Sequence, residues 1–279
     1  MTNRSSRRRF LQLAGASAVA CAASTRSRLS AAPAASVPYQ LGMASYTLRE
    51  FPVEQAIEMT KRLGLVRIAL KDFHLKMDAT SAQIADTVAK VKAAGLELYG
   101  GGVIYMKSEA QVDRAFEYAK AAGMKLIIGV PNYELLPYTN RKVQEYDLPV
   151  AIHNHGPDNP LFPTPQSAYE RIASLDRRIG LCIDAGHTQR SGIDPSESAV
   201  KYADRLFDVH IKDVSAATAE GRTVEIGRGV IDIPKLLRTL KGINFRGTLA
   251  LEYEKDAKDP LPGAAESIGY LRGVLATMA

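Results

Sequence analysis

One complete repeat of the fold lies between residues 149 and 187, which read PVAIHNHGPDNPLFPTPQSAYERIASLDRRIGLCIDAGH. This stretch begins with an apolar run over residues 149–153 and ends with a second apolar run over residues 180–184. An amphipathic segment over residues 165–178 separates the two runs. Short apolar runs alternating with helical patterns indicate β-α-β units and a parallel sheet. We therefore predict two buried strands joined by a helix, each strand ending in polar side chains.

The same rhythm extends outward from this repeat in both directions. The further predicted strands cover residues 39–48, 66–73, 96–105, 125–130, 207–211 and 247–252, and the further predicted helices cover residues 52–63, 81–94, 109–122, 195–205, 233–240 and 262–276. Eight strands alternating with helices in about 240 residues favour a barrel over an open doubly wound sheet. The sequence therefore predicts a single-domain (β/α)8 TIM barrel over residues 37–279.

One repeat departs from the pattern. Residues 133–146 should contain the fourth helix, but their apolar periodicity is weak and Pro137 interrupts them. Proline inside a helix removes a backbone hydrogen bond and clashes with the preceding turn. We therefore expect an irregular or shortened element in this segment.

The first 36 residues form a separate basic leader. They contain six arginines and no acidic residue, and residues 6–12, SRRRFLQ, resemble a twin-arginine export signal. The weakly apolar run over residues 11–23 is too short to span a bilayer. We expect residues 1–36 to be a cleavable signal and linker and the protein to be periplasmic. Lipid anchoring at Cys21 and a basic tail of an intracellular protein are less favoured alternatives.

The charge of the remaining chain limits its partners. The 36 basic residues of the whole chain include the six leader arginines, so the rest of the chain balances 30 basic against 30 acidic residues. A neutral domain lacks the electrostatic footprint for nucleic acid. Outside the leader only Cys182 remains, so no disulfide is expected. We expect no stable membrane association after cleavage, and the sequence leaves homo-oligomerisation open.

All five histidines occur at or just after the carboxyl end of a predicted strand: His74, His153, His155, His187 and His210. In a parallel barrel these ends converge on one mouth, where such folds have their active sites. Asp184 and Glu252 occupy equivalent positions. Imidazole and carboxylate groups suit divalent transition metals. The sequence therefore predicts a metal-binding active site at this mouth.

The alternation of side chains along a strand supports this arrangement. His153 and His155 share one face of their strand, as Cys182 and Asp184 do on the next one. For any single histidine the alternative is a packing or surface residue. For Asp184 the alternative is a helix cap.

Five short motifs carry a family resemblance. They are IHNHGP at 152–157, DAGH at 184–187, HIKD at 210–213, GRGVID at 227–232 and LEYE at 251–254. Together they resemble the xylose isomerase-like sugar phosphate isomerase/epimerase superfamily. The resemblance implies one divalent ion held by His153, Asp184, His210 and Glu252. Such a mixed set favours manganese or cobalt, with magnesium or zinc as alternatives.

Two positions differ from many members of that superfamily. His153 and Lys212 stand where others have glutamates. Reversible epimerisation often uses two metal-bound carboxylates, and the HIKD motif instead resembles the inosose dehydratase and keto-glycoside lyase branch. That resemblance implies a metal that polarises a ketone, a base that removes the adjacent proton and an acid that assists the leaving group.

Several residues are candidates for the remaining roles. Lys212, His155 and His187 are predicted to transfer protons, and His74 and Lys71 to contact the substrate. A cation beside Lys212 would lower the pKa of its ammonium group toward the working range. The alternatives are hydrogen-bonding support of the metal ligands for the histidines, and a surface position for the lysine.

Three functions remain after this reading. The leading hypothesis is a metal-dependent isomerase, epimerase or lyase acting on a keto-sugar, keto-glycoside or cyclic polyol. An uncharged small molecule is favoured over a sugar phosphate because no glycine-rich loop or arginine cluster for phosphate is present. The alternatives are a non-catalytic periplasmic sugar-binding protein and a metal-dependent abasic-site endonuclease. Neutral charge and a single metal site oppose the endonuclease.

Overall fold

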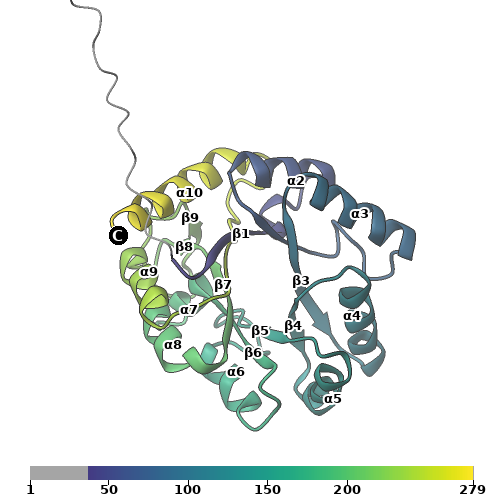
Figure 1. The fold of residues 1–279 in the computed structure, drawn as a ribbon. Helices are drawn as coiled ribbons and strands as arrows, with labels where there is room; N and C mark the ends of the chain where they lie inside the picture. The colour runs from purple at the N-terminus through teal and green to yellow at the C-terminus, as the bar shows by residue number, and fades with distance from the viewer. Residues whose placement is uncertain (1–36, 279) are drawn as a thin grey trace, which may run out of the picture. The chain divides into compact units, whose positions relative to one another are not determined.

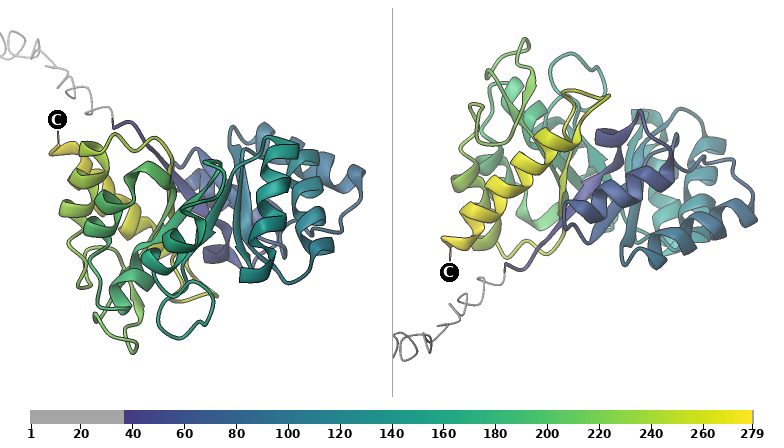
Figure 2. Two further views of the ribbon diagram at one scale, coloured as in Figure 1. Left: turned by 90° about the horizontal axis from the view of Figure 1, so that it is seen from below. Right: turned by 90° about the horizontal axis from the view of Figure 1, so that it is seen from above.

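The computed structural model describes residues 37–278. Eight parallel strands close into a barrel in the order β1-β10-β7-β6-β5-β4-β3-β2. Figure 1 shows the helices as a ring outside these strands, and Figure 2 shows the same arrangement from two other sides. The predicted (β/α)8 TIM barrel is confirmed. The predicted export signal and Cys21 lie outside the described residues.

The bounds of the elements follow the predicted rhythm closely. The barrel strands are β1 (Gln40–Ala44), β2 (Arg67–Leu70), β3 (Glu97–Met106), β4 (Leu126–Pro131), β5 (Val150–His153), β6 (Ile179–Asp184), β7 (Leu206–Ile211) and β10 (Thr248–Leu251). The helices are α2 (Val53–Arg62), α3 (Ser81–Ala93), α4 (Glu109–Ala121), α5 (Leu136–Tyr146), α6 (Pro165–Ile172), α7 (Ala185–Arg190), α8 (Pro195–Lys201), α9 (Ile233–Gly242) and α10 (Leu261–Ala276). Short 3-10 turns occupy Ser45–Leu48, Tyr133–Leu135 and Ala203–Arg205.

Helix starts are fixed by local side chains. Thr80 and Gln83 form a reciprocal capping box at the start of α3, and the Ser108 hydroxyl accepts a backbone hydrogen bond at the start of α4. Both caps satisfy N–H groups that have no partner within the helix. The connections that follow α3 and α4 contain Gly95 and Gly123, both at positive φ, where glycine avoids a steric penalty.

The fourth repeat agrees with its prediction in part, because residues 133–135 form a 3-10 turn and the α-helix is shortened accordingly. Residues 136–146 form a regular helix, because Pro137 lies in the first turn of α5. Proline is well tolerated there, since the first-turn N–H groups have no partner within the helix. In the next repeat α6 is shorter than predicted and ends at Ile172, and Arg178 instead binds Asp176 in the turn that follows.

Two elements were not predicted. Helix α7 begins directly after β6, because Asp184 Oδ1 accepts the backbone N–H of His187 at 2.7 Å and caps the helix. The second is a small antiparallel pair of β8 (Asp213–Val214) and β9 (Thr223–Val224). Both lie beyond the carboxyl ends of barrel strands, on the side of the molecule where the site is built.

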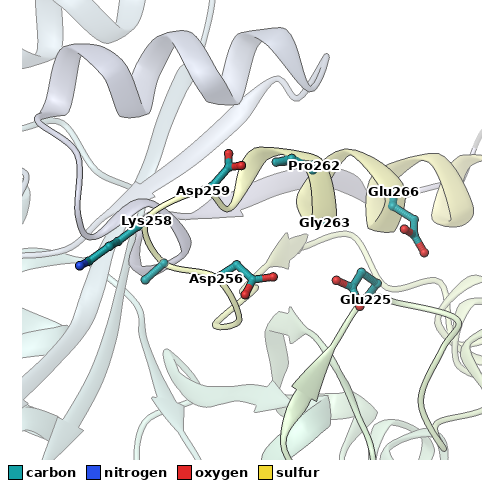
Figure 3. Close-up of a pocket in the computed structure, with 8 residues that line it drawn as sticks. Glu225, Asp256, Lys258, Asp259, Pro262, Gly263 and Glu266 are labelled. Atoms are coloured by element: carbon teal, nitrogen blue, oxygen red, sulfur yellow. The ribbon is translucent and has the colours of Figure 1, made fainter.

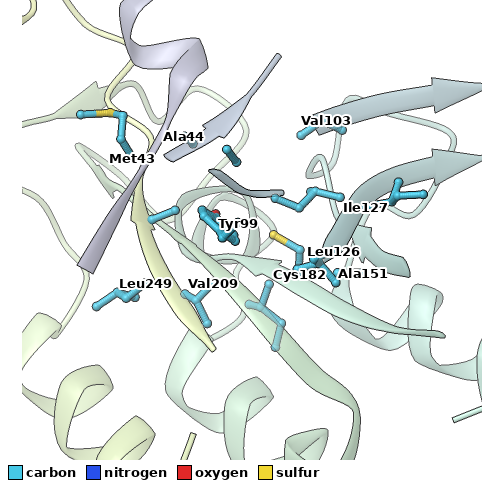
Figure 4. Close-up of a cluster of buried hydrophobic side chains, with 14 of the residues drawn as sticks. Met43, Ala44, Tyr99, Val103, Leu126, Ile127, Ala151, Cys182, Val209 and Leu249 are labelled. Atoms are coloured by element: carbon cyan, nitrogen blue, oxygen red, sulfur yellow. The ribbon is translucent and has the colours of Figure 1, made fainter. Parts of the chain in front are cut away.

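The core combines an apolar layer under the helices with a packed barrel interior. Figure 4 shows part of a buried cluster that includes Met43, Tyr99, Cys182 and Val209 from four different strands. Within it the Tyr99 hydroxyl donates to Asp208 Oδ2 at 3.1 Å. Among the described residues, no helix has the length and apolar character needed to cross a membrane. The packed side chains of this cluster fill the interior of the barrel beneath the carboxyl ends of its strands.

Candidate metal centre

The four predicted metal ligands meet at the carboxyl ends of consecutive barrel strands. His153 ends β5, Asp184 ends β6, His210 lies near the end of β7 and Glu252 follows β10. The register of β6 and β7 places Asp184 opposite His210. All four side chains are buried, and their ligand atoms lie within 4.8 Å of one another. Four elements that are distant in sequence thus build one cluster.

The ring nitrogens of the two histidines face the carboxylates. His153 Nε2 lies 3.5 Å from Asp184 Oδ2 and 3.9 Å from Glu252 Oε2. His210 Nδ1 lies 3.2 Å from Glu252 Oε2 and 3.1 Å from His153 Nε2. Two nitrogens and two oxygens therefore converge, a donor set that suits a divalent transition metal.

The charges of the cluster also fit a divalent ion. The Lys212 ammonium contacts Glu254, and it lies 2.8 Å from Glu252 Oε2 and 3.1 Å from Asp184 Oδ2. With neutral imidazoles, three carboxylates and one ammonium leave two negative charges. Asp184 Oδ2 is buried and makes no aligned hydrogen bond. A divalent cation would balance the two negative charges and bind Asp184 Oδ2. Such a partner is favourable because a buried charge is costly without one.

The local environment sets the protonation of the ligands. Burial raises the pKa values of Asp184 and Glu252, but the Lys212 ammonium and the neighbouring histidines together outweigh burial and hold both pKa values below their usual range. Burial lowers the pKa of His153 to about 4. The His210 pKa is raised, because Glu252 outweighs the opposing effect of burial. At neutral pH the carboxylates are charged and His153 keeps the free nitrogen lone pair that a metal ligand needs.

Without an ion, the surroundings of Lys212 act on its pKa in the direction opposite to the predicted effect of a metal. Burial lowers its pKa, but Asp184, Glu252 and Glu254 outweigh burial and hold the pKa well above its usual range. Its side chain is only 2 % exposed. It also passes directly over Gly186, where an added Cβ would lie 2.3 Å from Lys212 Cγ. In the protein without an ion, Lys212 is therefore an ammonium group locked beneath the site.

A cavity of about 390 Å³ opens above the cluster. Its lining contains two of the ligands and residues from both halves of the barrel: Tyr46, Lys71, Val103, Tyr105, His153, His155, His187, Glu252 and Glu254. The predicted residues His155, His187 and Lys71 thus share a cavity with two of the four candidate metal ligands. Lys212 is not part of the lining.

The two additional histidines of the cavity are held by defined partners. His155 Nε2 lies 2.9 Å from the Tyr105 hydroxyl, and His155 Nδ1 lies 3.3 Å from His153 Nδ1. His187 Nδ1 accepts from Arg190 Nη1 at 3.3 Å. Burial lowers the pKa of His155 to about 3 and also lowers that of His187. Both rings are therefore neutral at neutral pH.

The two predicted substrate contacts occupy different surroundings. Lys71 Nζ donates to the Val103 carbonyl at 2.8 Å and lines the cavity. His74 Nε2 lies 3.0 Å from the carbonyl of Phe51 and 3.2 Å from that of Leu48, and the ring is not part of the lining. The position of His74 thus gives it a role in holding the connection between β1 and α2 and does not support a substrate contact.

Sequence reasoning missed Asp208, which lies beneath the metal centre. Asp208 Oδ2 lies 4.0 Å from His210 Nε2, on the side of the ring away from the cluster. Burial raises the Asp208 pKa to about 6. Asp208 Oδ1 and His210 Nε2 have no hydrogen-bond partner among the described residues. Strand alternation could have found this residue, because Asp208 and His210 share one face of β7.

Asp213, next to Lys212, organises a neighbouring loop. Its carboxylate accepts the backbone N–H groups of Val214, Gly227, Gly229 and Ile231 at 2.9–3.2 Å. These bonds tie the GRGVID motif to the start of β8. Asp213 therefore has a structural role.

Another cavity, of about 640 Å³, lies beside the start of α10 (Figure 3). Half of its lining residues are acidic: Glu225, Asp256, Asp259 and Glu266. Glu225 accepts from the Tyr253 hydroxyl and from Lys255 Nζ, each at 2.8 Å. None of the four metal-ligand candidates lines this cavity.

Comparison with known proteins relates the chain to sugar-modifying enzymes. The model of the xylose isomerase-like TIM barrel family matches residues 53–274. The chain is 28% identical over 144 residues to the rhizopine catabolism protein MocC of Rhizobium meliloti, covering 46% of this chain and 44% of MocC. It is 29% identical over 111 residues to inosose dehydratase of Clostridium perfringens, covering 34% of this chain and 37% of the dehydratase. The matches thus span less than half of these relatives.

A solved structure reproduces the fold over most of the chain. The apo form of 3-keto-D-glucoside 4-epimerase YcjR from E. coli aligns with a TM-score of 0.69 at 16% identity. The alignment covers 84% of this chain and 99% of the epimerase. At this identity the likeness shows a shared fold.

Proposed function

The chain belongs to the xylose isomerase-like TIM barrel family, and from this premise we propose a divalent-metal-dependent isomerase, epimerase or lyase. Its substrate would be a keto-sugar, a keto-glycoside or a cyclic polyol, and the reaction would begin with removal of a proton next to a carbonyl group. One observation carries the proposal. His153, Asp184, His210 and Glu252 converge below a cavity that can admit a small molecule.

The four side chains would hold one ion, with manganese or cobalt favoured by the mixed imidazole and carboxylate set. When bound, this ion would polarise a substrate carbonyl and make the neighbouring C–H group more acidic.

The protein would supply the groups that move protons and orient the substrate. Glu254 lines the cavity and contacts Lys212, so we assign it the role of proton acceptor. Lys212, as a buried ammonium, contacts Glu252 and Glu254 and holds the two carboxylates in one place. His187 accepts from Arg190 at Nδ1, so its neutral ring carries a proton on Nε2 and suits a hydrogen bond to a substrate oxygen.

The cavity favours an uncharged substrate. Among the described residues of its lining, Lys71 is the one lysine or arginine. Phosphate is usually bound by several cationic or backbone N–H groups. The names of the related inosose dehydratases are consistent with a cyclic polyol ketone. We propose that the chain acts in the periplasm, since residues 1–36 resemble an export signal.

The proposal can be tested on the full chain. Protein purified after periplasmic fractionation would be analysed for bound metals and then incubated with manganese and a 3-keto-glucoside or an inosose in deuterated buffer. We expect NMR to show exchange of carbon-bound protons or elimination. Asp184→Asn should abolish the reaction, and Asp204→Asn, an exposed partner of Arg177, should not. Metal binding without exchange on any of these sugars would instead indicate a sugar-binding protein.

A further inference from the structure

A chain of hydrogen-bonding contacts leads from the metal centre to the cavity wall. His153 Nε2 faces the carboxylates, and His153 Nδ1 lies 3.3 Å from His155 Nδ1. His155 Nε2 in turn lies 2.9 Å from the Tyr105 hydroxyl. Tyr105 belongs to β3, on the opposite half of the barrel, and lines the cavity. Both ring nitrogens of His153 and both of His155 thus take part in this series of contacts.

The direction of these hydrogen bonds depends on His153. A neutral imidazole that binds a cation through Nε2 carries its proton on Nδ1. His153 Nδ1 then donates to His155 Nδ1, so the proton of the His155 ring resides on Nε2. His155 Nε2 donates in turn to the Tyr105 oxygen. The Tyr105 proton then has no acceptor on His155, so it is available to the cavity or to the nearby Asn159 side chain.

The reverse direction is incompatible with metal binding. If Tyr105 donated to His155 Nε2, the neutral His155 ring would carry its proton on Nδ1 and donate to His153 Nδ1. His153 would then carry its own proton on Nε2, the nitrogen that faces Asp184 and Glu252. A protonated nitrogen cannot be a ligand. One direction therefore goes with a loaded site and the other with an empty one.

We propose that Tyr105 is a catalytic residue that donates a hydrogen bond to a substrate oxygen, and that His155 is the positioning residue that frees this proton once His153 binds an ion. This inference rests on the proposed function for its substrate and for the ion at His153, and on the contacts of His153, His155 and Tyr105 for the direction of the hydrogen bonds. It also removes His155 from the candidate bases, because both ring nitrogens are engaged.

The direction of the hydrogen bonds between His153, His155 and Tyr105 can be determined experimentally without a substrate. In protein labelled with nitrogen-15 at histidine, NMR distinguishes the two tautomers of each ring. With zinc, a diamagnetic ion, we expect His155 to be protonated on Nε2 and His153 on Nδ1. His74, which is bound to backbone carbonyls outside the cavity, is the internal control and should not change. A His155 ring protonated on Nδ1 in the zinc-loaded protein would overturn the proposal.

Two variants separate the roles. Tyr105→Phe should leave zinc affinity within about twofold but weaken inosose binding about tenfold, the effect of one lost hydrogen bond. His155→Phe should weaken zinc binding by about 10–100-fold, because His153 loses the partner of Nδ1. Tyr138→Phe, which removes a hydroxyl bound to Asp113 outside the cavity, is the matched control.

The outcomes distinguish this inference from the proposed function. An inosose affinity unchanged in Tyr105→Phe would contradict the role of Tyr105. Absence of proton exchange in wild type with the expected tautomers present would contradict the proposed reaction and leave the direction of the chain intact. Circular dichroism would establish that each variant is folded; if Tyr105→Phe is not, the tautomers of the wild type still decide the direction.

Discussion

The strands β1 to β4 and the strands β5, β6, β7 and β10 end in different kinds of side chain. The second half supplies all four candidate metal ligands, and Lys212 lies just beyond β7. The first half supplies Tyr46, Lys71, Val103 and Tyr105 to the cavity wall. One half therefore concentrates buried charge, and the other presents a mixed polar and apolar wall.

This difference suggests that the candidate metal ligands belong to one half, whereas the cavity wall that a substrate would contact is built by both halves. Substitutions in the second half should change metal affinity and the stability of the metal-free protein. Substitutions in the first half should change substrate binding and leave the metal centre intact. The following predictions test this division, beginning with the largest expected effect.

The buried ammonium is the strongest test. Lys212→Met should lower the free energy of unfolding of the metal-free protein by about 3–5 kcal/mol, because it leaves buried carboxylates without a cation. Urea unfolding in EDTA measures this, and added manganese should restore part of the loss. Lys71→Met, the matched change in the first half, should cost less than about 1 kcal/mol. Equal costs for the two lysines would contradict the division.

Removal of a ligand should act on affinity. Asp184→Asn should weaken manganese binding by more than about 100-fold, since even a supporting residue is worth about 10–100-fold. Isothermal titration calorimetry on the full chain gives the dissociation constant, with Asp204→Asn as the exposed control. An affinity within twofold of wild type would show that these four residues are not the metal site.

The histidines of the second half should make the metal-free protein sensitive to acid. The folded pKa values of His153 and His155 are depressed to about 4 and about 3, against 6.5 for the unfolded chain. The unfolded state therefore binds more protons as the pH falls, and stability present above pH 6.5 is lost as the pH falls toward 4. The loss is up to about 1.4 kcal/mol per pH unit for each ring. Urea unfolding between pH 7.5 and 5 should show the free energy of unfolding falling with pH, and His155→Gln should reduce this dependence. An unchanged dependence in His155→Gln would show that His155 does not contribute to it.

Asp208 should affect the metal without contacting it. If His210 binds the ion through Nδ1, its proton resides on Nε2 and faces Asp208. Asp208→Asn should then weaken manganese binding by about 10–100-fold. The metal-free variant should not be destabilised above pH 6, because the wild-type carboxylate ionises near that pH at the cost of burial. Calorimetry at pH 7.5 measures the manganese affinity of the variant, and urea unfolding at the same pH measures its stability. A destabilised variant with normal manganese affinity would contradict both expectations.

Lys71 should give the smallest effect. Lys71→Met removes the lysine of the cavity wall and should raise the KM for an active sugar by about tenfold, the lower end of the value of one charged hydrogen bond. Manganese affinity should stay within twofold of wild type. A loss of manganese affinity would show that the two halves are coupled.

The sequence was sufficient to predict the barrel and the four converging residues. Strand alternation decides the face of His153 and His210, and closure of a parallel barrel brings all carboxyl ends to one mouth. His74 could not be placed in this way, because it lies in a connection beyond β2, where no strand period fixes the direction of the ring. The pKa of Lys212 depends on three carboxylates from two other elements, and only their positions in space show that they surround it.

Gly186 places a constraint on how this site can diverge. Because Gly186 has no side chain, the aliphatic part of Lys212 can fill the space beside it. A Cβ at residue 186 would occupy the same space as Lys212 Cγ. A protein of this fold that has a side chain at the position of Gly186 should have a residue smaller than lysine at the position of Lys212. If the lysine arose while that side chain was still present, the two would clash. We expect the two positions to covary among homologues, and a chain that has lost the glycine can be recognised from sequence as having a different charge arrangement under its metal.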